Sequence, residues 1–137
     1  MSVFHNQAAF MEVMGQEQTT ANAALYAELV NEEVVRELVP ALHKYLSAPT
    51  TENLVDVVDG GIDSIVVIAG LLNCLIGPDK AAMAWQEVQR SNMSKAVWDG
   101  QNWQVMRRED GKVLKPASFS PPNLFDLVAG IPTGGEW

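Results

Sequence analysis

Apolar residues recur mostly at three- and four-residue spacing along the chain, and this spacing predicts helices. The first pattern covers residues 3–15 and ends at Gly15, a natural helix stop. A second pattern runs from Ala21 to Tyr45, and Pro40 is expected to bend or split it. The first third of the chain is therefore predicted to form one short helix and one long, bent helix.

The most apolar run of the chain predicts a third helix. It follows the turn sequence SAPTTEN, where Thr50 or Thr51 can cap its start, and it ends before Gly77 and Pro78. Its second half is apolar on every side, which is typical of a helix buried at the centre of a fold. A fourth helix is predicted over residues 79–95.

The last third of the chain has a different pattern. The stretch WQVMRREDGKVLK contains two short runs about Asp110 and Gly111, a pair typical of a tight hairpin turn. The tail PASFSPPNLFDLV predicts an extended strap with a last helical turn, so hairpin and strap cover about residues 101–128. The sequence predicts an all-α bundle of four to five helices with a short C-terminal β-hairpin, in a single domain of residues 1–137.

Composition narrows the classes of function. The only cysteine, Cys74, lies in the apolar run, so an internal disulfide and a cysteine-based zinc site are excluded. A formal net charge of -8 disfavours nucleic acid polymers and anionic membranes as partners. We expect no signal peptide and no membrane span, and a cytoplasmic location. The basic residues nevertheless gather late in the chain, at Arg107, Arg108, Lys112 and Lys115.

Three aspartates stand at the start of the apolar run. On a helix Asp56, Asp59 and Asp63 share one face, and that face continues into apolar positions rather than into solvent. The same helical spacing places Glu33 and Glu37 on one face of the preceding helix. Carboxylates on two facing helices repel one another unless a divalent cation lies between them, and ligation by oxygen alone suits magnesium or manganese.

A simpler interpretation of some of these acids remains open. Asp56 lies near a helix start, where the helix dipole favours a negative charge that points outward. Glu28 and Glu32 follow a different face, on which Glu32 and Arg36 can form an ion pair in solvent.

Five blocks of sequence resemble a known family. They are LVNEEVVREL, DVVDGGIDSIVVIAG, EVQRSNMSK, RREDGKVLKP and SPPNL, and they span about residues 3–127. In this order they resemble the MazG-like superfamily of all-α nucleoside triphosphate pyrophosphohydrolases. The likeness is to its small phage and bacterial branch, which is related to phosphoribosyl-ATP pyrophosphohydrolase.

The resemblance implies a magnesium site. The family motif is Glu-x-x-Glu on one helix and Glu/Asp-x-x-Asp on the next, and Asp56 with Asp59 matches the second half. In the first half Arg36 stands where the second glutamate is expected, so the role passes to Glu33 and Glu37, with Glu33 as the catalytic base. Glu32 is the alternative to Glu37 as the second residue of this half. The resemblance further implies that Glu32 and Asp63 support these ligands or hold a second metal ion.

The implied reaction is hydrolysis of a nucleoside triphosphate between its α- and β-phosphates, which gives the monophosphate and pyrophosphate. The residues expected to bind the substrate are Asn92, Lys95, Arg108, Lys112 and Lys115. A homodimer or homotetramer is expected from the resemblance, and also from the apolar helix and four tryptophans, Trp85, Trp98, Trp103 and Trp137. Two alternatives remain open: a non-catalytic helical interaction module on the same fold, and phosphoribosyl-ATP pyrophosphohydrolase itself.

Overall fold

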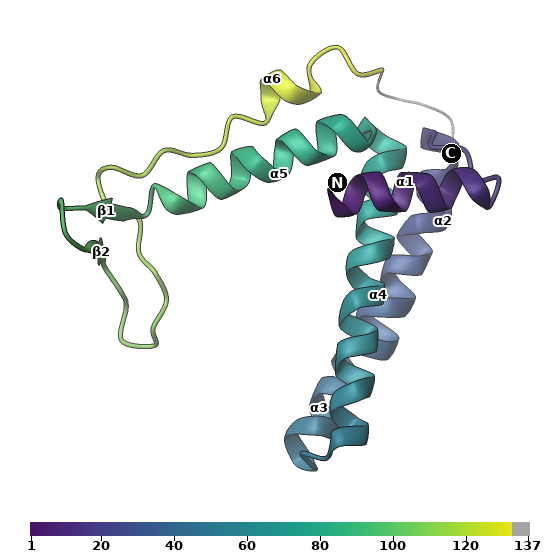
Figure 1. Ribbon diagram of the computed structural model, residues 1–137, viewed down its shortest axis with the longest axis horizontal. Coiled ribbons are helices and arrows are strands. Elements are labelled where there is room, and N and C mark those ends of the chain that lie inside the picture. Colours follow the sequence, from purple (N-terminus) through teal and green to yellow (C-terminus); the bar gives the residue numbers. More distant parts are fainter. Residues whose placement is uncertain (133–137) are drawn as a thin grey trace. The chain divides into compact units, whose positions relative to one another are not determined.

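The computed structural model describes residues 1–132 of the chain, and they are mostly helical (Figure 1). The predicted fold class, all-α with a short C-terminal hairpin, is confirmed. The elements are α1 (Val3–Val13), α2 (Thr20–Val30), the π-helix η1 (Asn31–Leu38), α3 (Val39–Ser47), α4 (Thr51–Ile76), α5 (Pro78–Met93), β1 (Ala96–Trp98), β2 (Trp103–Val105) and α6 (Phe125–Val128).

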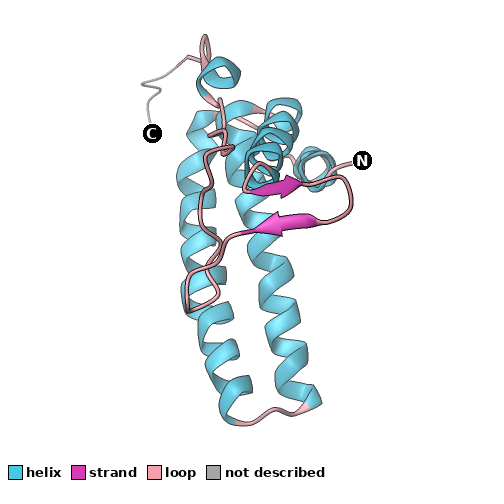
Figure 2. Cartoon of the chain, turned by 90° about the vertical axis from the view of Figure 1, so that its left-hand side faces the viewer, coloured by secondary structure: helices cyan, strands magenta, loops and turns pink. Residues whose placement is uncertain are grey.

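Two compact units make up the chain, one formed by Met1–Ala81 and the other by Ala82–Gly130. In the first unit α2, η1 and α3 follow one another and pack along α4, and α1 also packs on α4. Figure 2 shows the two long helical columns of this unit joined at one end by a short loop. These five helical segments form a bundle, as predicted, whereas most of the helix predicted over residues 79–95, α5, belongs to the second unit.

Helix α4 begins and ends at the predicted signals. The side chain of Thr50 accepts a hydrogen bond from the backbone N–H of Asn53 at 3.2 Å and caps the helix. Gly77 ends it with a φ of 79°, a conformation that side chains other than glycine rarely adopt. Among the described residues no single helix is both long and apolar enough to cross a membrane, although α4 and α5, a bent pair, meet that test when taken together.

The predicted bend near Pro40 takes the form of a π-helix. The residues on both sides of η1 keep right-handed helical backbone angles, so α2, η1 and α3 are continuous. At the end of η1 the N–H of Val39 bonds to the C=O of Val34, five residues earlier. Pro40 has no N–H to donate and its ring crowds the carbonyl four residues before it, which disfavours a regular α-helical turn there. A wider turn relieves this conflict without breaking the helix.

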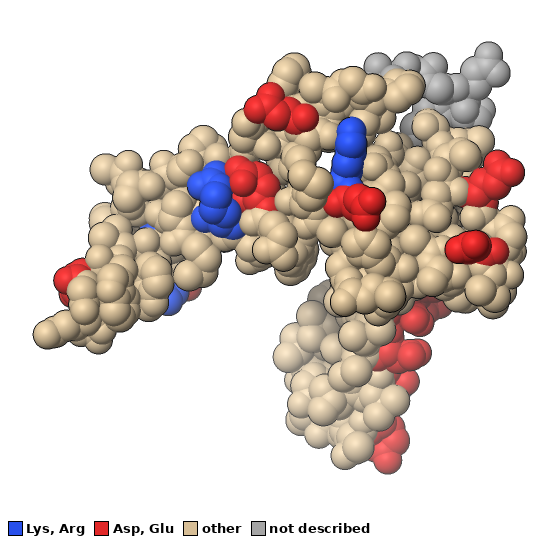
Figure 3. Space-filling model, turned by 45° about the horizontal axis from the view of Figure 1, so that its top comes forward, with Lys and Arg blue, Asp and Glu red and all other residues tan. Residues whose placement is uncertain are grey.

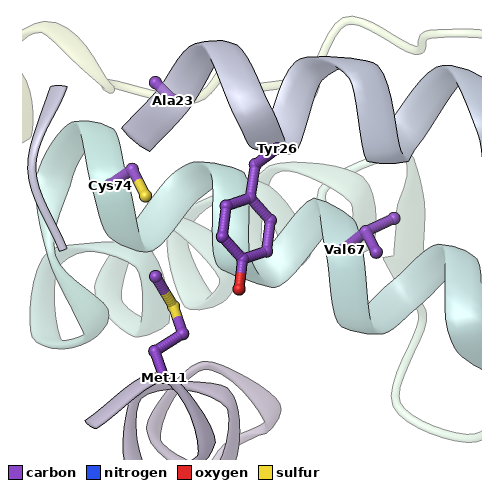
Figure 4. Close-up of a cluster of buried hydrophobic side chains, with 5 residues drawn as sticks. All are labelled: Met11, Ala23, Tyr26, Val67 and Cys74. Carbon is purple, nitrogen blue, oxygen red and sulfur yellow. The ribbon is translucent and has the colours of Figure 1, made fainter. Parts of the chain in front are cut away.

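Three helices meet in the core of the first unit. Figure 4 shows Tyr26 reaching from α2 between Val67 and Cys74 of α4 toward Met11 of α1. The Tyr26 hydroxyl donates to Gln16 Oε1 at 2.6 Å and accepts from Gln7 Nε2 at 3.2 Å, so this buried polar group is satisfied. Burial raises the pKa of the Cys74 thiol, as expected for a small core residue rather than a nucleophile.

The hairpin of the second unit lies earlier in the chain than predicted. Strands β1 and β2 pair antiparallel with Trp98 opposite Trp103, and residues 99–102 form the connecting loop. The predicted turn at Asp110 and Gly111 also exists, but only an isolated bridge between Arg107 and Val113 flanks it. Sequence reasoning found this second turn and missed the first.

Candidate carboxylate and cation sites

Glycine at position 70 lets α2 approach α4 very closely. A Cβ added to Gly70 would lie 2.0 Å from Cε1 of Tyr26, far inside van der Waals contact. Because Tyr26 is 2% exposed and fills the core, its ring has little room to move aside. The absence of a side chain at position 70 is therefore a condition for the packing of these two helices.

A second close approach fixes how η1 lies on α4. A Cβ at Gly60 would lie 3.2 Å from the Cα of Leu38, so backbone meets backbone at this point. Tyr26 thus faces Gly70 and Leu38 faces Gly60 on antiparallel helices. Twelve residues separate Tyr26 from Leu38, and ten separate Gly70 from Gly60. Counting from either contact brings Glu33 level with residues 63–65, and Glu37 level with the turn that carries Asp59.

Glu33 occupies an unusual position in this contact. Its side chain is half-buried, and its Oε2 atom is shielded from solvent without a hydrogen-bond partner. The buried hydroxyl nearest by register, that of Ser64, donates to the C=O of Gly60 at 2.6 Å, within its own helix. A carboxylate oxygen that is removed from water without a hydrogen-bond partner destabilises the fold. Binding of a cation or a proton to this oxygen would offset that loss.

Carboxylates surround Glu33. Burial raises the pKa of the Glu33 carboxyl above its ordinary value, and the neighbouring Glu37 side chain raises it further. The negative charges of Asp63 and Glu32 act on this pKa in the same direction. Glu37, Glu32 and Asp63 are therefore near enough to Glu33 to act on its charge across η1 and α4.

The other predicted ligands lie further toward solvent. Asp56 and Asp59 are exposed on α4, whereas Asp63 is half-buried. Within residues 1–132 no group of three or more His, Cys, Asp or Glu side chains lies close enough together to hold a metal ion. Figure 3 shows acidic side chains gathered along one side of the long helices of the first unit.

All the predicted substrate-binding residues belong to the second unit. Lys95 Nζ donates to Asn92 Oδ1 at 3.1 Å, at the end of α5. Arg108 pairs with Asp110 beside it, through Nε to Oδ1 at 3.0 Å. The Nζ of Lys115 lies 4.9 Å from the ring centre of Phe119. Lys112 is exposed, and its backbone N–H donates to Asp110 Oδ1 at 3.1 Å.

Sequence reasoning missed the contacts that hold the strap. Glu87 of α5 accepts two hydrogen bonds from Arg90, at 2.8 and 2.9 Å, and one from the N–H of Asn123 at 2.9 Å. Arg90 also donates to the C=O of Pro121 at 3.2 Å. These groups line a hollow of about 670 Å³ with Met83 and other residues of α5 and the strap. The spacing of Glu87 and Arg90 signals an ion pair, but nothing in the sequence signals its strap partners.

Comparison with known protein families and with curated proteins finds no match. The proposals below rest on the residues and contacts described above.

Proposed function

We propose that this chain is a magnesium-dependent nucleoside triphosphate pyrophosphohydrolase, which cleaves between the α- and β-phosphates to give the monophosphate and pyrophosphate. The observation that carries the proposal is the state of Glu33, a half-buried carboxylate with a solvent-shielded oxygen that lacks a partner. A protein gains no stability from such a group in isolation, so its cost suggests a use in chemistry. The likeness to the MazG-like superfamily supports the same assignment.

The π-helix offers an explanation for the altered first half of the motif. Glu33 and Glu37 are four residues apart, where the family pattern has three. A π-helical turn contains more residues than an α-helical one, so one additional residue can be taken up without turning the second glutamate away. This supports the assignment of Glu33 and Glu37 as the pair that works with α4.

The chemistry of the donor atoms suits a hard divalent cation. Glu33, Glu37, Asp59 and Asp63 offer only oxygen atoms, which magnesium and manganese prefer, and the orphaned oxygen of Glu33 is the atom that most lacks a partner. Asp56 and Glu32 would complete or support this set. When bound, the metal would neutralise phosphate charge and lower the pKa of a water molecule.

The raised pKa of Glu33 suits the role of general base. A carboxylate whose proton affinity is increased by burial and by Glu37 takes a proton from an attacking water more readily than an ordinary one. In the second unit Lys95, Arg108, Lys112 and Lys115 would bind phosphate oxygens, with Asn92 holding Lys95 in place. Lys112 is the foremost of these because, among the described residues, no hydrogen bond, ion pair or aromatic contact engages its side chain, whereas the other three cations each have one.

Self-association is part of the proposal. Four apolar residues on successive turns of α4 are about half exposed: Val55, Val58, Ile62 and Ile65. A groove of about 380 Å³ between α1 and α4 adjoins this stripe, with Phe10 on its other wall. An apolar surface of this kind marks an interface, so we propose a homodimer or homotetramer. Trp137, which also suggested self-association, lies outside the described residues.

Pyrophosphate release from a panel of ribo- and deoxynucleoside triphosphates, with phosphoribosyl-ATP as a further substrate, tests the proposal. We expect release that requires magnesium or manganese and falls by about a hundredfold in Glu33→Gln, the scale of a lost catalytic electrostatic group. Glu28→Gln is the matched control, because Glu28 is exposed on another face of α2. If no substrate releases pyrophosphate, the interaction module on the same fold becomes the better interpretation.

A further inference from the structure

The hairpin of the second unit presents two tryptophans side by side. Trp98 and Trp103 are directly opposite each other on β1 and β2, with ring centres 5.4 Å apart and ring planes at 59°. Such a tilted pair contributes to the stability of a short hairpin. Yet Trp98 is 53% exposed and Trp103 is 54% exposed, so the contact between them leaves a large part of each ring uncovered.

A tightly bonded loop fixes this pair in place. Asp99 Oδ1 accepts hydrogen bonds from the N–H groups of Gln101 and Asn102, at 2.8 and 2.7 Å. Its Oδ2 accepts another from Gln104 Nε2 at 2.8 Å. The rings are therefore held by a pre-organised turn, and a ligand that stacks on them loses little to ordering the protein.

Cations share the hairpin with the aromatic pair. Residues 95–115 hold five of the nine Lys and Arg of the chain but only three of its seventeen Asp and Glu, so this segment is basic in an acidic protein. Arg107 lies four residues after Trp103, just beyond the end of β2, and bridges to Val113. At the usual rise of an extended chain these four residues span about 13 Å. One N–H of Arg107 donates to the C=O of Gly111 at 3.2 Å, and its other donors remain for a ligand.

We propose that the Trp98–Trp103 pair is a stacking surface for the base of a nucleotide whose phosphates reach the cations of the same hairpin. Every base has a π-face, so such a surface binds purine and pyrimidine nucleotides alike. A cation about 13 Å away suits a ligand that is aromatic at one end and anionic at the other. The choice of a nucleotide rests on the proposed function, whereas stacking itself requires no hydrolysis.

Fluorescence provides the first test. In a Trp85→Phe, Trp137→Phe background the hairpin tryptophans are the only indole fluorophores of the full chain. With EDTA present to prevent turnover, we expect ATP, GTP, CTP and UTP each to quench the emission, and inorganic triphosphate to leave it unchanged. Equal responses to the nucleotides and to inorganic triphosphate would show that the base does not reach the rings.

Calorimetry separates stacking from a purely structural role of the tryptophans. Trp98→Ala should weaken nucleotide binding by about tenfold, within the range measured for single base stacks, and leave the affinity for inorganic triphosphate unchanged. Trp98→Phe keeps an aromatic face and should lose no more than about threefold. Trp85→Ala is the matched control, a tryptophan of the same unit that is 55% exposed.

Each remaining outcome has a distinct meaning. Equal losses for nucleotide and inorganic triphosphate in Trp98→Ala would mean that the pair only supports the hairpin, and the inference would fail. A change in oligomeric mass without a change in nucleotide affinity would assign the pair to contact with a second copy. Because binding is measured without turnover, quenching in a protein that releases no pyrophosphate would preserve this inference and overturn the proposed enzyme.

Discussion

The acidic face between η1 and α4 and the basic hairpin both gather like charges, but they accommodate them differently. On the acidic face Glu33 is half-buried beside Glu37 and Asp63, and this crowding raises its pKa. In the hairpin segment most cations are exposed, and some have a neutral or acidic partner, such as Asp110 for Arg108 or Asn92 for Lys95. Repulsion between the carboxylates of the acidic face is therefore strong, whereas solvent screens the repulsion between the cations of the hairpin.

This difference indicates what each region can bind. A carboxylate cluster held by close helix packing cannot spread apart, so relief must come from a proton or a cation. The hairpin cations pair with residues close in sequence, and these pairs are exposed to solvent and weak. A phosphate can therefore replace such a partner at a small cost in free energy. The acidic face between η1 and α4 therefore suits a metal ion, and the basic hairpin suits an anion of variable shape.

The largest effect is expected where the packing leaves no space. Gly70→Ala places a methyl group within 2.0 Å of the buried Tyr26 ring and should destabilise the protein by about 3 kcal/mol. Gly61→Ala is the matched control on the same helix, because its Cβ meets only Leu38 Cδ1 at 3.9 Å. That change should stabilise the protein by about 0.5 to 1 kcal/mol, since alanine favours helix over glycine.

Chemical denaturation measures both variants. A Gly70→Ala protein as stable as the parent would contradict the close approach of α2 to α4. That result would also mean that α2 and η1 are not held tightly against α4, so the carboxylates near Glu33 would be free to move apart.

Divalent cations should stabilise the acidic region. A metal ion that binds only the folded protein raises its stability by about 2.7 kcal/mol at a hundred times the dissociation constant, which corresponds to a rise in Tm of several degrees. We expect this rise with millimolar magnesium or manganese against EDTA, and a much smaller rise in Asp59→Asn. An identical Tm in EDTA and in magnesium would show that the carboxylates bind no cation in the folded protein.

The pH dependence of stability tests the crowding of Glu33 without any metal. Its pKa is raised on folding, so the folded protein holds this proton more tightly than the unfolded chain does. Its contribution therefore favours folding at pH below the ordinary glutamate pKa, and is lost as pH rises through the elevated folded pKa. In EDTA at pH 7, Glu33→Gln should raise Tm by about 2 °C, and this gain should vanish near pH 4.

A lower Tm for Glu33→Gln at pH 7 would mean that the charged carboxylate is stabilised by its surroundings. The matched variant Glu28→Gln should show no such pH dependence, because Glu28 is exposed on another face.

Sequence alone predicted the helices well, because their signals are local. The cap at Thr50 and the stop at Gly77 determine the bounds of α4 by hydrogen bonding and by backbone conformation. The hairpin was misplaced although Asp99–Gly100 is the same Asp-Gly pair as Asp110–Gly111, so the sequence offers two turn signals of one kind and dipeptide type does not choose between them. The first turn is followed by a paired strand and carries Trp98 against Trp103 across it, and this contact between side chains is not marked by the turn residues.

The candidate site was predictable in residue type but not in geometry. Helical spacing grouped Glu33 with Glu37 and the three aspartates with one another. Which aspartate faces Glu33 depends on the register between η1 and α4, and that register is fixed by Gly60 and Gly70. The sequence favoured Asp56 and Asp59 as the partners of Glu33. In the structure Asp63 is the aspartate whose negative charge raises the pKa of Glu33.

The smallest effect concerns the strap of the second unit. Hydrogen bonds from Arg90, and then from the N–H of Asn123, lower the pKa of Glu87 to about 2. Since this pKa falls on folding from the ordinary value of 4.5, the stabilisation is complete above pH 4.5 and is lost as pH falls toward about 2. Arg90 is exposed and Glu87 only half-buried, so solvent screens the pair and we expect Glu87→Gln to change Tm by less than about 1 °C.

The local consequence is more visible than the global one. Amide hydrogen exchange at Asn123 should accelerate several-fold in Glu87→Gln at neutral pH, because the acceptor of that N–H is weakened. Arg108→Gln is the matched control: it removes an exposed Arg–Asp pair within the turn at residues 108–111 and should leave exchange at Asn123 unchanged. Equal exchange in all three proteins would show that Glu87 does not hold the strap, and that the second unit is bound together by its apolar contacts rather than by this charge.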